Sequence, residues 1–171
     1  MAPIIISPCT ASDGPAIAEN NIPAFWTDST WVLIWPGKTC DYVTEQAARR
    51  TPHTLLMDPA HRRHQMAVDE GTGAVVGYCR WILPCSAERA PEAASAEALD
   101  HSIPCQCMEL WPEARAPKVE DEEVRLEFER QFKAADWEYD HSLDVLDESM
   151  MEMKARLMAK KNYICAPLTE K

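Results

Sequence analysis

The chain has 171 residues, 46% of them hydrophobic, which is enough apolar material for one globular core. Its formal net charge of −11 disfavours a nucleic-acid partner, because phosphate backbones are also anionic. The apolar runs are too short to span a membrane, and the start of the chain lacks the basic region of a signal peptide.

The N-terminal region is predicted to form a strand followed by a helix. Residues 3–8 (PIIISP) are typical of a short strand, since three isoleucines lie between two prolines. A helix is expected over about 14–25, because Pro15 suits a first helical position. Ser12 or Asp13 could accept the free amide protons of its first turn.

A second helix and a hairpin are predicted in the middle of the chain. The helix covers about residues 40–50 and is followed by extended chain through Pro52. The hairpin pairs residues 65–70 with 74–83, which are rich in β-branched and aromatic side chains. Its turn is Gly71-Thr72-Gly73, a short connection with glycine at both ends, and this pattern predicts antiparallel pairing.

The second half is predicted to begin with an irregular insertion rich in proline, alanine and glutamate, at about residues 85–118. Helices follow over about 124–139 and from Ser142 to about 161, and residues 163–168 indicate a last short strand. The later helix carries an apolar seam at spacings of three and four residues, which favours a core face. The seam consists of Leu143, Leu146, Met150, Met153 and Leu157.

Two local patterns indicate a family. Residues 10–18 follow the pattern T/S-x-x-D-x-x-x-I-A, with Phe25 at the end of the same helix, and the hairpin follows V-D-x-x-T-G-x-I-V-G-Y-x-R-W-x-x-P. The hairpin residues that match are Val68, Asp69, Thr72, Gly73, Val75, Val76, Gly77, Tyr78, Arg80, Trp81 and Pro84. With this order of elements, residues 4–84 resemble the N-terminal half of the GNAT superfamily of N-acyltransferases, in particular its fungal-type members. The similarity resumes loosely at about 140–168.

The resemblance implies an α+β fold, a single GNAT-like domain over residues 1–171 with a short mixed or antiparallel sheet and packed helices. It also implies acyl transfer from acetyl-CoA to a small-molecule or peptide amine. In that family the loop between the first two helices helps to form the acceptor pocket. We therefore expect Phe25, Trp26 and Trp31 to bind substrate, with aromatic packing over the sheet as the alternative.

One part of the family pattern is missing. Complete members bind the coenzyme diphosphate with an R/Q-x-x-G-x-G/A loop that opens a helix, because glycine lets backbone amides approach the phosphates. The five glycines here all occur at or before Gly77, so the last 94 residues cannot supply this loop. We expect a domain truncated after its fourth strand and weakly active or inactive alone, with acetyl-CoA as co-substrate only where the fold is complete. The resemblance assigns no catalytic or cofactor-binding residue.

A non-catalytic role is the alternative function. Residues 109–152 hold fifteen acidic and five basic side chains, a net charge of −10. This indicates a solvated acidic face or attraction to a cationic substrate. An uncovered sheet edge favours pairing with another chain, so the second hypothesis is an interaction module that uses its acidic helices and that edge, including a homo-oligomer.

Two other clusters are weaker indications of a site. His101, Cys105 and Cys107 lack the spacing and the fourth ligand of a zinc site, so we predict no metal and a reduced thiol pair. The seven cysteines are an odd number, which favours free thiols and a cytoplasmic location. The basic residues 61–64 are expected to border the first hairpin strand, with an anion contact as the alternative.

Overall fold

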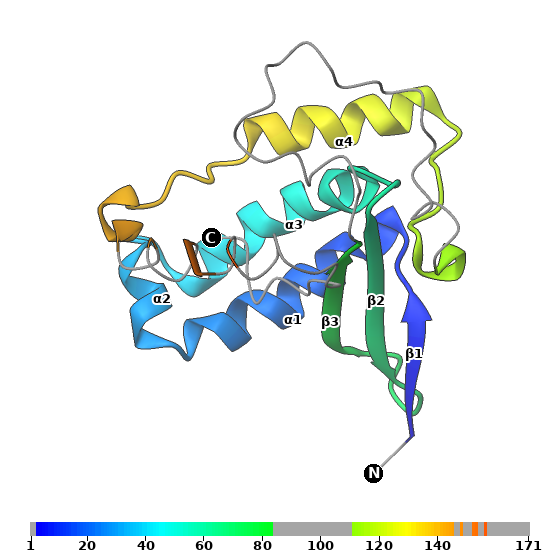
Figure 1. Cartoon of the computed structure of the whole chain (residues 1–171), viewed down its shortest axis with the longest axis horizontal. Helices are drawn as coiled ribbons and strands as arrows, with labels where there is room; N and C mark the ends of the chain where they lie inside the picture. The colour runs from blue at the N-terminus through cyan, green and yellow to red at the C-terminus, as the bar shows by residue number, and fades with distance from the viewer. Residues whose placement is uncertain (1–2, 84–110, 146–147, 149–151, 154–155, 157–171) are drawn as a thin grey trace.

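The computed structural model describes residues 3–83 and 111–145 and positions 148, 152, 153 and 156 (Figure 1). They form an α+β fold in which an antiparallel sheet of order β1-β2-β3 packs against helices. The strands are β1 (Ile4–Pro8), β2 (Arg62–Asp69) and β3 (Val75–Ile82). The helices are α1 (Gly14–Trp26), α2 (Ser29–Leu33), α3 (Cys40–Leu56) and α4 (Glu122–Ala134), with short 3-10 helices η1 (Ala11–Asp13), η4 (Pro112–Ala114) and η5 (His141–Leu143).

The predicted hairpin is confirmed, and β2 begins three residues earlier than expected. Met66 pairs with Tyr78, and the pairing shifts at a bulge between Ala67 and Val68. The turn is closed by hydrogen bonds across it, since the Gly73 amide donates to the Asp69 carbonyl over 2.8 Å. Gly73 has a φ of +72°, a backbone conformation that favours glycine.

Helix α1 begins where the sequence predicts, but neither Ser12 nor Asp13 caps it as expected. The Asp13 carboxylate turns back and accepts hydrogen bonds from the amide and hydroxyl of Thr10, at 2.7 and 2.8 Å. These bonds close η1, and no side-chain hydrogen bond caps the first turn of α1. The carboxylate is therefore used by the turn that precedes the helix.

The prediction that the second helix ends near residue 50 is wrong, because α3 continues through Pro52 to Leu56. Proline lacks the amide that would extend the helical hydrogen bonding. The hydroxyl of Thr51 donates to the Ala47 carbonyl over 2.8 Å, and Thr54 donates likewise to Arg50 over 3.0 Å. These bonds and the packing of the helix outweigh the local preference of proline to end a helix.

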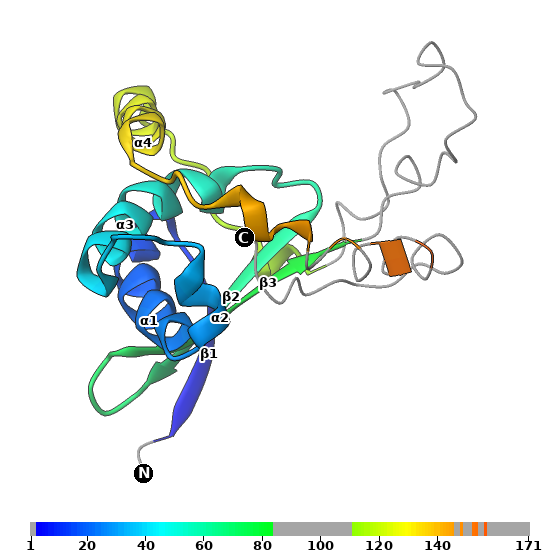
Figure 2. The same ribbon diagram turned by 90° about the vertical axis from the view of Figure 1, so that its left-hand side faces the viewer.

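Helix α1 packs against the sheet at β3, and α3 lies between α1 and α4 (Figures 1 and 2). Two groups of buried side chains fill these layers. The first, between the helices, consists of Ala18, Ile22, Trp31, Ile34, Trp35, Val43 and Ala47. The second, between helices and sheet, consists of Cys9, Ile17, Leu55 and Ala116, with Met66, Val75 and Tyr78 packed against it.

The helix predicted over 124–139 is shorter, because α4 ends at Ala134 and the following residues are extended. Asp140, and not Ser142, caps the next turn by accepting a hydrogen bond from the Ser142 amide over 2.9 Å. The described positions 145, 148, 152, 153 and 156 are helical. Within the predicted apolar seam, Met153 is 58% exposed, and the other four side chains lie outside the described set.

Residues 85–110 of the predicted insertion and the last predicted strand, 163–168, lie outside the described residues. Residues 111–118 are irregular apart from η4, and Ala114 and Ala116 are buried. Trp111 lies on Trp81 of β3, with ring centroids 5.6 Å apart. In the described part of the chain, no helix combines the length and apolar character needed to cross a bilayer.

Candidate functional site

The three predicted substrate-binding residues lie together at the junction of α1 and α2. Asp28 caps α2 by accepting a hydrogen bond from the Thr30 amide over 2.8 Å, and this sharp turn folds α2 back onto α1. The ring of Trp31 is then 5.6 Å from Phe25 and 5.7 Å from Trp26, between centroids. Trp31 is 8% exposed, whereas Phe25 and Trp26 are half-buried and accessible in part.

The aromatic cluster continues through Trp35 to residues 135–141, which we call the strap. Trp35 is 5.5 Å from Trp31, and the strap residues Trp137 and Tyr139 lie 4.9 and 5.9 Å from Trp35. The Asp140 amide donates to the Ile34 carbonyl over 2.8 Å. The strap therefore covers Trp35, which follows α2, and it leads from α4 back towards α2 (Figure 1).

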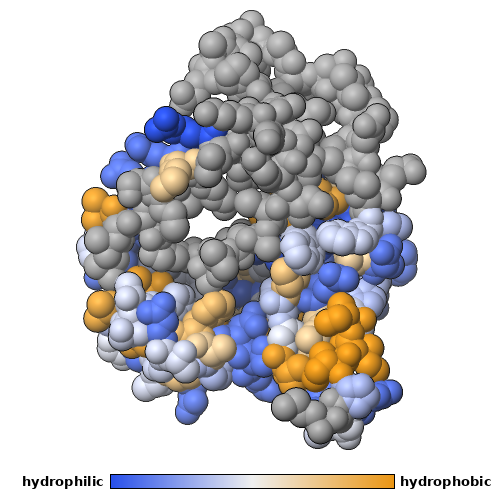
Figure 3. Space-filling view, turned by 60° about the horizontal axis from the view of Figure 1, so that its bottom comes forward, coloured by the Kyte–Doolittle hydropathy of each residue, from blue (hydrophilic) through white to orange (hydrophobic). Residues whose placement is uncertain are grey.

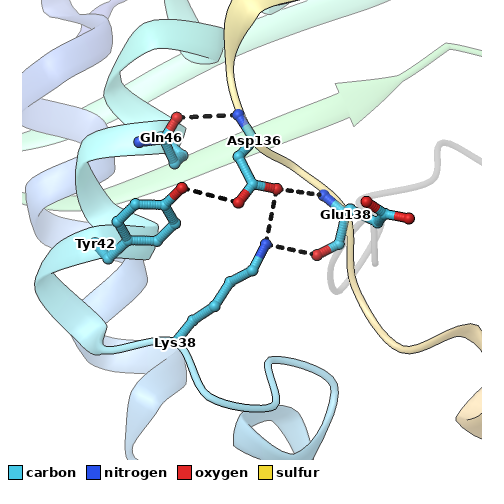
Figure 4. A network of polar contacts seen from close by, with 5 residues as sticks. All are labelled: Lys38, Tyr42, Gln46, Asp136 and Glu138. Atoms are coloured by element: carbon cyan, nitrogen blue, oxygen red, sulfur yellow. Dashed lines mark hydrogen bonds and ion pairs between the residues drawn. The ribbon is translucent and has the colours of Figure 1, made fainter.

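A polar network ties the strap to α3 (Figure 4). The Lys38 ammonium donates to Asp136 Oδ1 over 2.8 Å and to the Glu138 carbonyl over 2.7 Å. The Tyr42 hydroxyl donates to Asp136 Oδ2 over 2.8 Å, and the Asp136 amide donates to Gln46 Oε1 over 3.0 Å. One carboxylate thus joins a lysine, a tyrosine and the strap backbone.

Local structure places Lys38 in this network. Gly37 has a φ of +74°, and the turn that it permits brings the Lys38 amide to the Trp35 carbonyl at 3.1 Å. The Lys38 ammonium then lies over two rings, 5.6 Å from the Trp35 centroid and 5.9 Å from that of Tyr42. The Lys38 side chain is only 19% exposed, compared with 42% for Asp136.

The electrostatics of the network favour a cation at this place. Hydrogen bonds from Lys38 and then from Tyr42 lower the pKa of Asp136 to about 2, so the carboxylate is ionised at neutral pH. The same hydrogen bond to Asp136 raises the pKa of Tyr42, which remains a neutral donor. A carboxylate, a carbonyl and two ring faces are the groups that bind an alkylammonium ion in water.

A second cation fixes the strap from the other side. The Arg50 guanidinium lies 4.1 Å from the Phe132 ring centroid of α4 and 5.2 Å from that of Trp137. His53, one turn further along α3, is 4.8 Å from Phe132. These contacts explain why α4 lies on α3 although none of the α4 side chains is fully buried.

His64 and Tyr78 form a polar pair on the neighbouring hairpin strands. His64 is 1% exposed, and its Nδ1 atom is 2.8 Å from the Tyr78 hydroxyl. Burial, with smaller contributions from nearby arginines, lowers the pKa of His64 to about 4, and burial also raises the pKa of Tyr78. Both side chains are neutral at pH 7, and His64 Nε2 has no hydrogen-bond partner among the described residues.

The basic residues 61–64 lie at the start of β2, as predicted, and their side chains contact the turn that precedes this strand. His61 Nδ1 is 2.8 Å from Asp58 Oδ1, and Arg63 donates to the Pro59 carbonyl over 3.0 Å. Arg63 is fully buried and also donates to the Arg62 carbonyl over 2.8 Å. These hydrogen bonds fix the start of β2. The alternative role of residues 61–64, contact with an anion, stays a hypothesis.

No group of three metal-ligating side chains occurs within the described ranges. His101, Cys105 and Cys107 lie outside those ranges, so the prediction about them remains open. Cys9 is buried, and burial raises the pKa of its thiol to about 12. A buried thiol of this kind behaves as a small apolar side chain.

Strand β1 exposes its three isoleucines at the edge of the sheet. The exposed fractions are 53% for Ile4, 45% for Ile5 and 61% for Ile6, and Val76 of β3 is 48% exposed. Figure 3 shows apolar side chains gathered at this end of the sheet. The α4 surface also has a hollow of about 630 Å³, and the described residues that line it all come from that one helix.

No protein-family model, no curated protein and no solved structure matches this chain. The candidate site is therefore defined by geometry alone. Phe25, Trp26 and Trp31 are the site residues that the sequence predicts, and the prediction did not include Lys38 and Asp136. A usable signal was the alternation of acidic and aromatic residues over 136–139, which is unusual in a segment read as helix.

Proposed function

We propose that the chain is a GNAT-like N-acyltransferase unit and that its described part forms the acceptor-amine side of the fold. The single observation that carries this proposal is the order of elements, a strand, a helical segment and a hairpin, with all strands antiparallel in the order β1-β2-β3. That arrangement is what the resemblance of residues 4–84 implies. Transfer would join an amine to the acyl group of acetyl-CoA.

The aromatic cluster supports an amine acceptor. Phe25 and Trp26 are partly exposed beside Trp31, close to the segment between α1 and α3 where the resemblance predicts the acceptor pocket. Ring faces attract a cationic or apolar amine. The ionised carboxylate of Asp136 on the strap already binds the ammonium of Lys38, which supports a small-molecule or peptide amine as a ligand of this region.

The chemistry also sets an expectation about rate. The amine nitrogen must lose its proton and attack the thioester carbonyl, and the thiolate must leave. The last 94 residues contain no glycine with which to build a tight backbone cradle for the coenzyme diphosphate. We therefore propose weak acetyl-CoA binding and weak or no turnover by this chain alone.

Calorimetric titration of acetyl-CoA and mass spectrometry of a panel of acylated amines would test the proposal. We expect weak coenzyme binding, traces of acylated amine above the uncatalysed level, and less product after Phe25→Ala. Leu33→Ala is the matched control, because Leu33 lies on α2 with 62% of its surface exposed. Absence of both coenzyme binding and product would reject an acyltransferase role.

A non-catalytic interaction module is the second candidate, and the exposed isoleucines of β1 favour it. An edge strand offers unpaired backbone groups, and Ile4, Ile5 and Ile6 add an apolar surface for another chain, including a second copy. The acidic residues of α4 contribute less to binding another chain, since Glu127 and Glu129 pair with basic side chains of the same helix. The cytoplasmic location stays a prediction.

Sedimentation velocity over a range of concentrations distinguishes this candidate. If β1 mediates self-association, Ile6→Lys abolishes the concentration-dependent species, because a charge would then face an apolar interface. Val145→Lys is the control, since Val145 is 66% exposed and lies outside the sheet. A monomer at all concentrations would exclude the homo-oligomer.

A further inference from the structure

We propose that the junction of α3 and the strap is a binding site for a primary alkylammonium ion, such as a lysine side chain, and that Lys38 occupies it here as an internal ligand. The inference deepens the proposed function, on which it rests for its biological meaning, by naming the class of amine. The site itself is defined by contacts in the described residues and requires no acyl donor.

The Lys38 ammonium has charged, polar and aromatic contacts. Lys38 Nζ has an anionic acceptor in Asp136 at 2.8 Å and a neutral acceptor in the Glu138 carbonyl at 2.7 Å. It also faces the rings of Trp35 and Tyr42 at 5.6 and 5.9 Å. These contacts supply a charge, a carbonyl and two ring faces, so the lysine is bound as an alkylammonium ligand would be.

Asp136 also has contacts that do not involve Lys38. Its Oδ2 accepts from Tyr42 at 2.8 Å, its Oδ1 accepts from the Glu138 amide at 3.3 Å, and its own amide donates to Gln46 at 3.0 Å. These contacts fix the carboxylate from the α3 side and from the strap (Figure 4). If Lys38 leaves, the carboxylate therefore remains oriented for another cation.

Trp35 forms a wall of the site through the face of its ring. It is 3% exposed, and the Lys38 ammonium lies 5.6 Å from its ring centroid. Its indole N–H has no hydrogen-bond partner among the described residues, and because it is itself a donor it does not bind an ammonium. The ring face is therefore the part of Trp35 that attracts the cation.

Closure of the strap and occupation of the site are linked. Asp136 and Glu138 belong to the strap, and the strap residues Trp137 and Tyr139 cover Trp35. An ammonium bound between α3 and the strap stabilises the closed position. Because Lys38 is tethered beside the site, it has a high effective concentration there, and a second amine must displace it.

Chemical rescue tests the inference. Lys38→Ala removes Cγ, Cδ, Cε and Nζ, which together correspond to n-propylamine. We expect the variant to unfold at a lower temperature and n-propylammonium to restore about half or more of the lost Tm with saturable dependence. We expect 1-propanol, which has the same shape without the charge, to restore none, and the wild-type protein to respond to neither.

Two further variants make the result specific. Asp136→Asn in the Lys38→Ala background should weaken the response to n-propylammonium by about tenfold or more, because the charged acceptor is lost. Lys133→Ala is the matched control, since Lys133 forms an exposed ion pair with Glu129 on α4 and leaves no such site. It should not respond to the amine.

A Lys38→Ala protein that folds but shows no saturable response, or responds equally to 1-propanol, overturns the site and shows Lys38 to be a simple tether. If the variant does not fold alone, the folded yield after refolding with n-propylammonium is compared with that after refolding with 1-propanol. A higher yield with the amine supports the site, and equal yields overturn it. No sample contains an acyl donor, so failure here leaves acyl transfer untouched, and failure of acyl transfer leaves the site standing.

Discussion

The backbone of Gly14 lies directly against the ring of Pro52, so that a Cβ atom at Gly14 would be 2.6 Å from Pro52 Cδ. This contact joins the first turn of α1 to the C-terminal half of α3. Neither residue is usual at its position, because glycine and proline both disfavour helices. Together they permit the close approach of α1 and α3.

Gly14→Ala should therefore destabilise the protein by about 1–3 kcal/mol, although alanine is the better helix former. The ring of Pro52 cannot rotate away, so the helices must separate. Urea unfolding at neutral pH measures the loss. Gly77→Ala is the control, since its Cβ would lie at an ordinary 3.6 Å from the Ala67 Cβ, and a loss as large as that of Gly14→Ala would contradict this explanation.

Trp35→Ala should cost about 3–5 kcal/mol, because it removes the ring shared by the α2 cluster and the strap. We also expect the strap to become accessible to protease, since Trp137 and Tyr139 lose their contact with Trp35. Limited proteolysis with mass spectrometry would show cleavage within residues 135–141. Leu33→Ala, at a 62% exposed neighbour, should change neither stability nor cleavage appreciably.

His64 should make stability depend on pH in mildly acidic solution. Its pKa is about 4 in the folded protein, below its ordinary value of 6.5, so the unfolded chain takes up the proton first. Stability is unaffected above about pH 6.5 and falls by up to about 3 kcal/mol as the pH decreases towards 4.

His64→Phe tests this assignment, because phenylalanine keeps the volume and cannot be protonated. Urea unfolding of both proteins at several pH values between 7 and 4 should give a flatter profile for the variant. The variant also leaves the Tyr78 hydroxyl without its partner, which lowers stability at every pH and does not alter the slope. Parallel profiles would show that another group causes the acid sensitivity.

Asp136 should affect the stability of the protein at a lower pH than His64 does. Its pKa is about 2 in the folded protein, below the ordinary 3.8, so it stabilises the fold above about pH 4 and this contribution is lost as the pH falls towards 2. Asp136→Asn should lower Tm at pH 7 and reduce the further loss between pH 4 and 2. Glu122→Gln is the control, because Glu122 pairs with Arg125 at the exposed start of α4. Equal acid profiles for Asp136→Asn and the wild type would contradict the network.

The sequence by itself determined the elements whose signals are local. The β2–β3 hairpin follows from its turn glycines and β-branched strands, and the start of α1 follows from Pro15, because turn and cap chemistry acts within a few residues. The proximity of Phe25, Trp26 and Trp31 was likewise within reach, since a short turn separates them. Their role as substrate-binding residues remains a proposal.

Only the tertiary structure decided the length of α3, the extended strap and the ammonium site. Pro52 predicts the end of a helix, yet packing against Gly14 keeps it inside α3. Residues 135–139 predict helix, but the contacts of Asp136 with Lys38, Tyr42 and Gln46 hold them extended. Lys38 and Asp136 are 98 positions apart, and a contact between such distant residues depends on how the helices pack, which local preference does not encode.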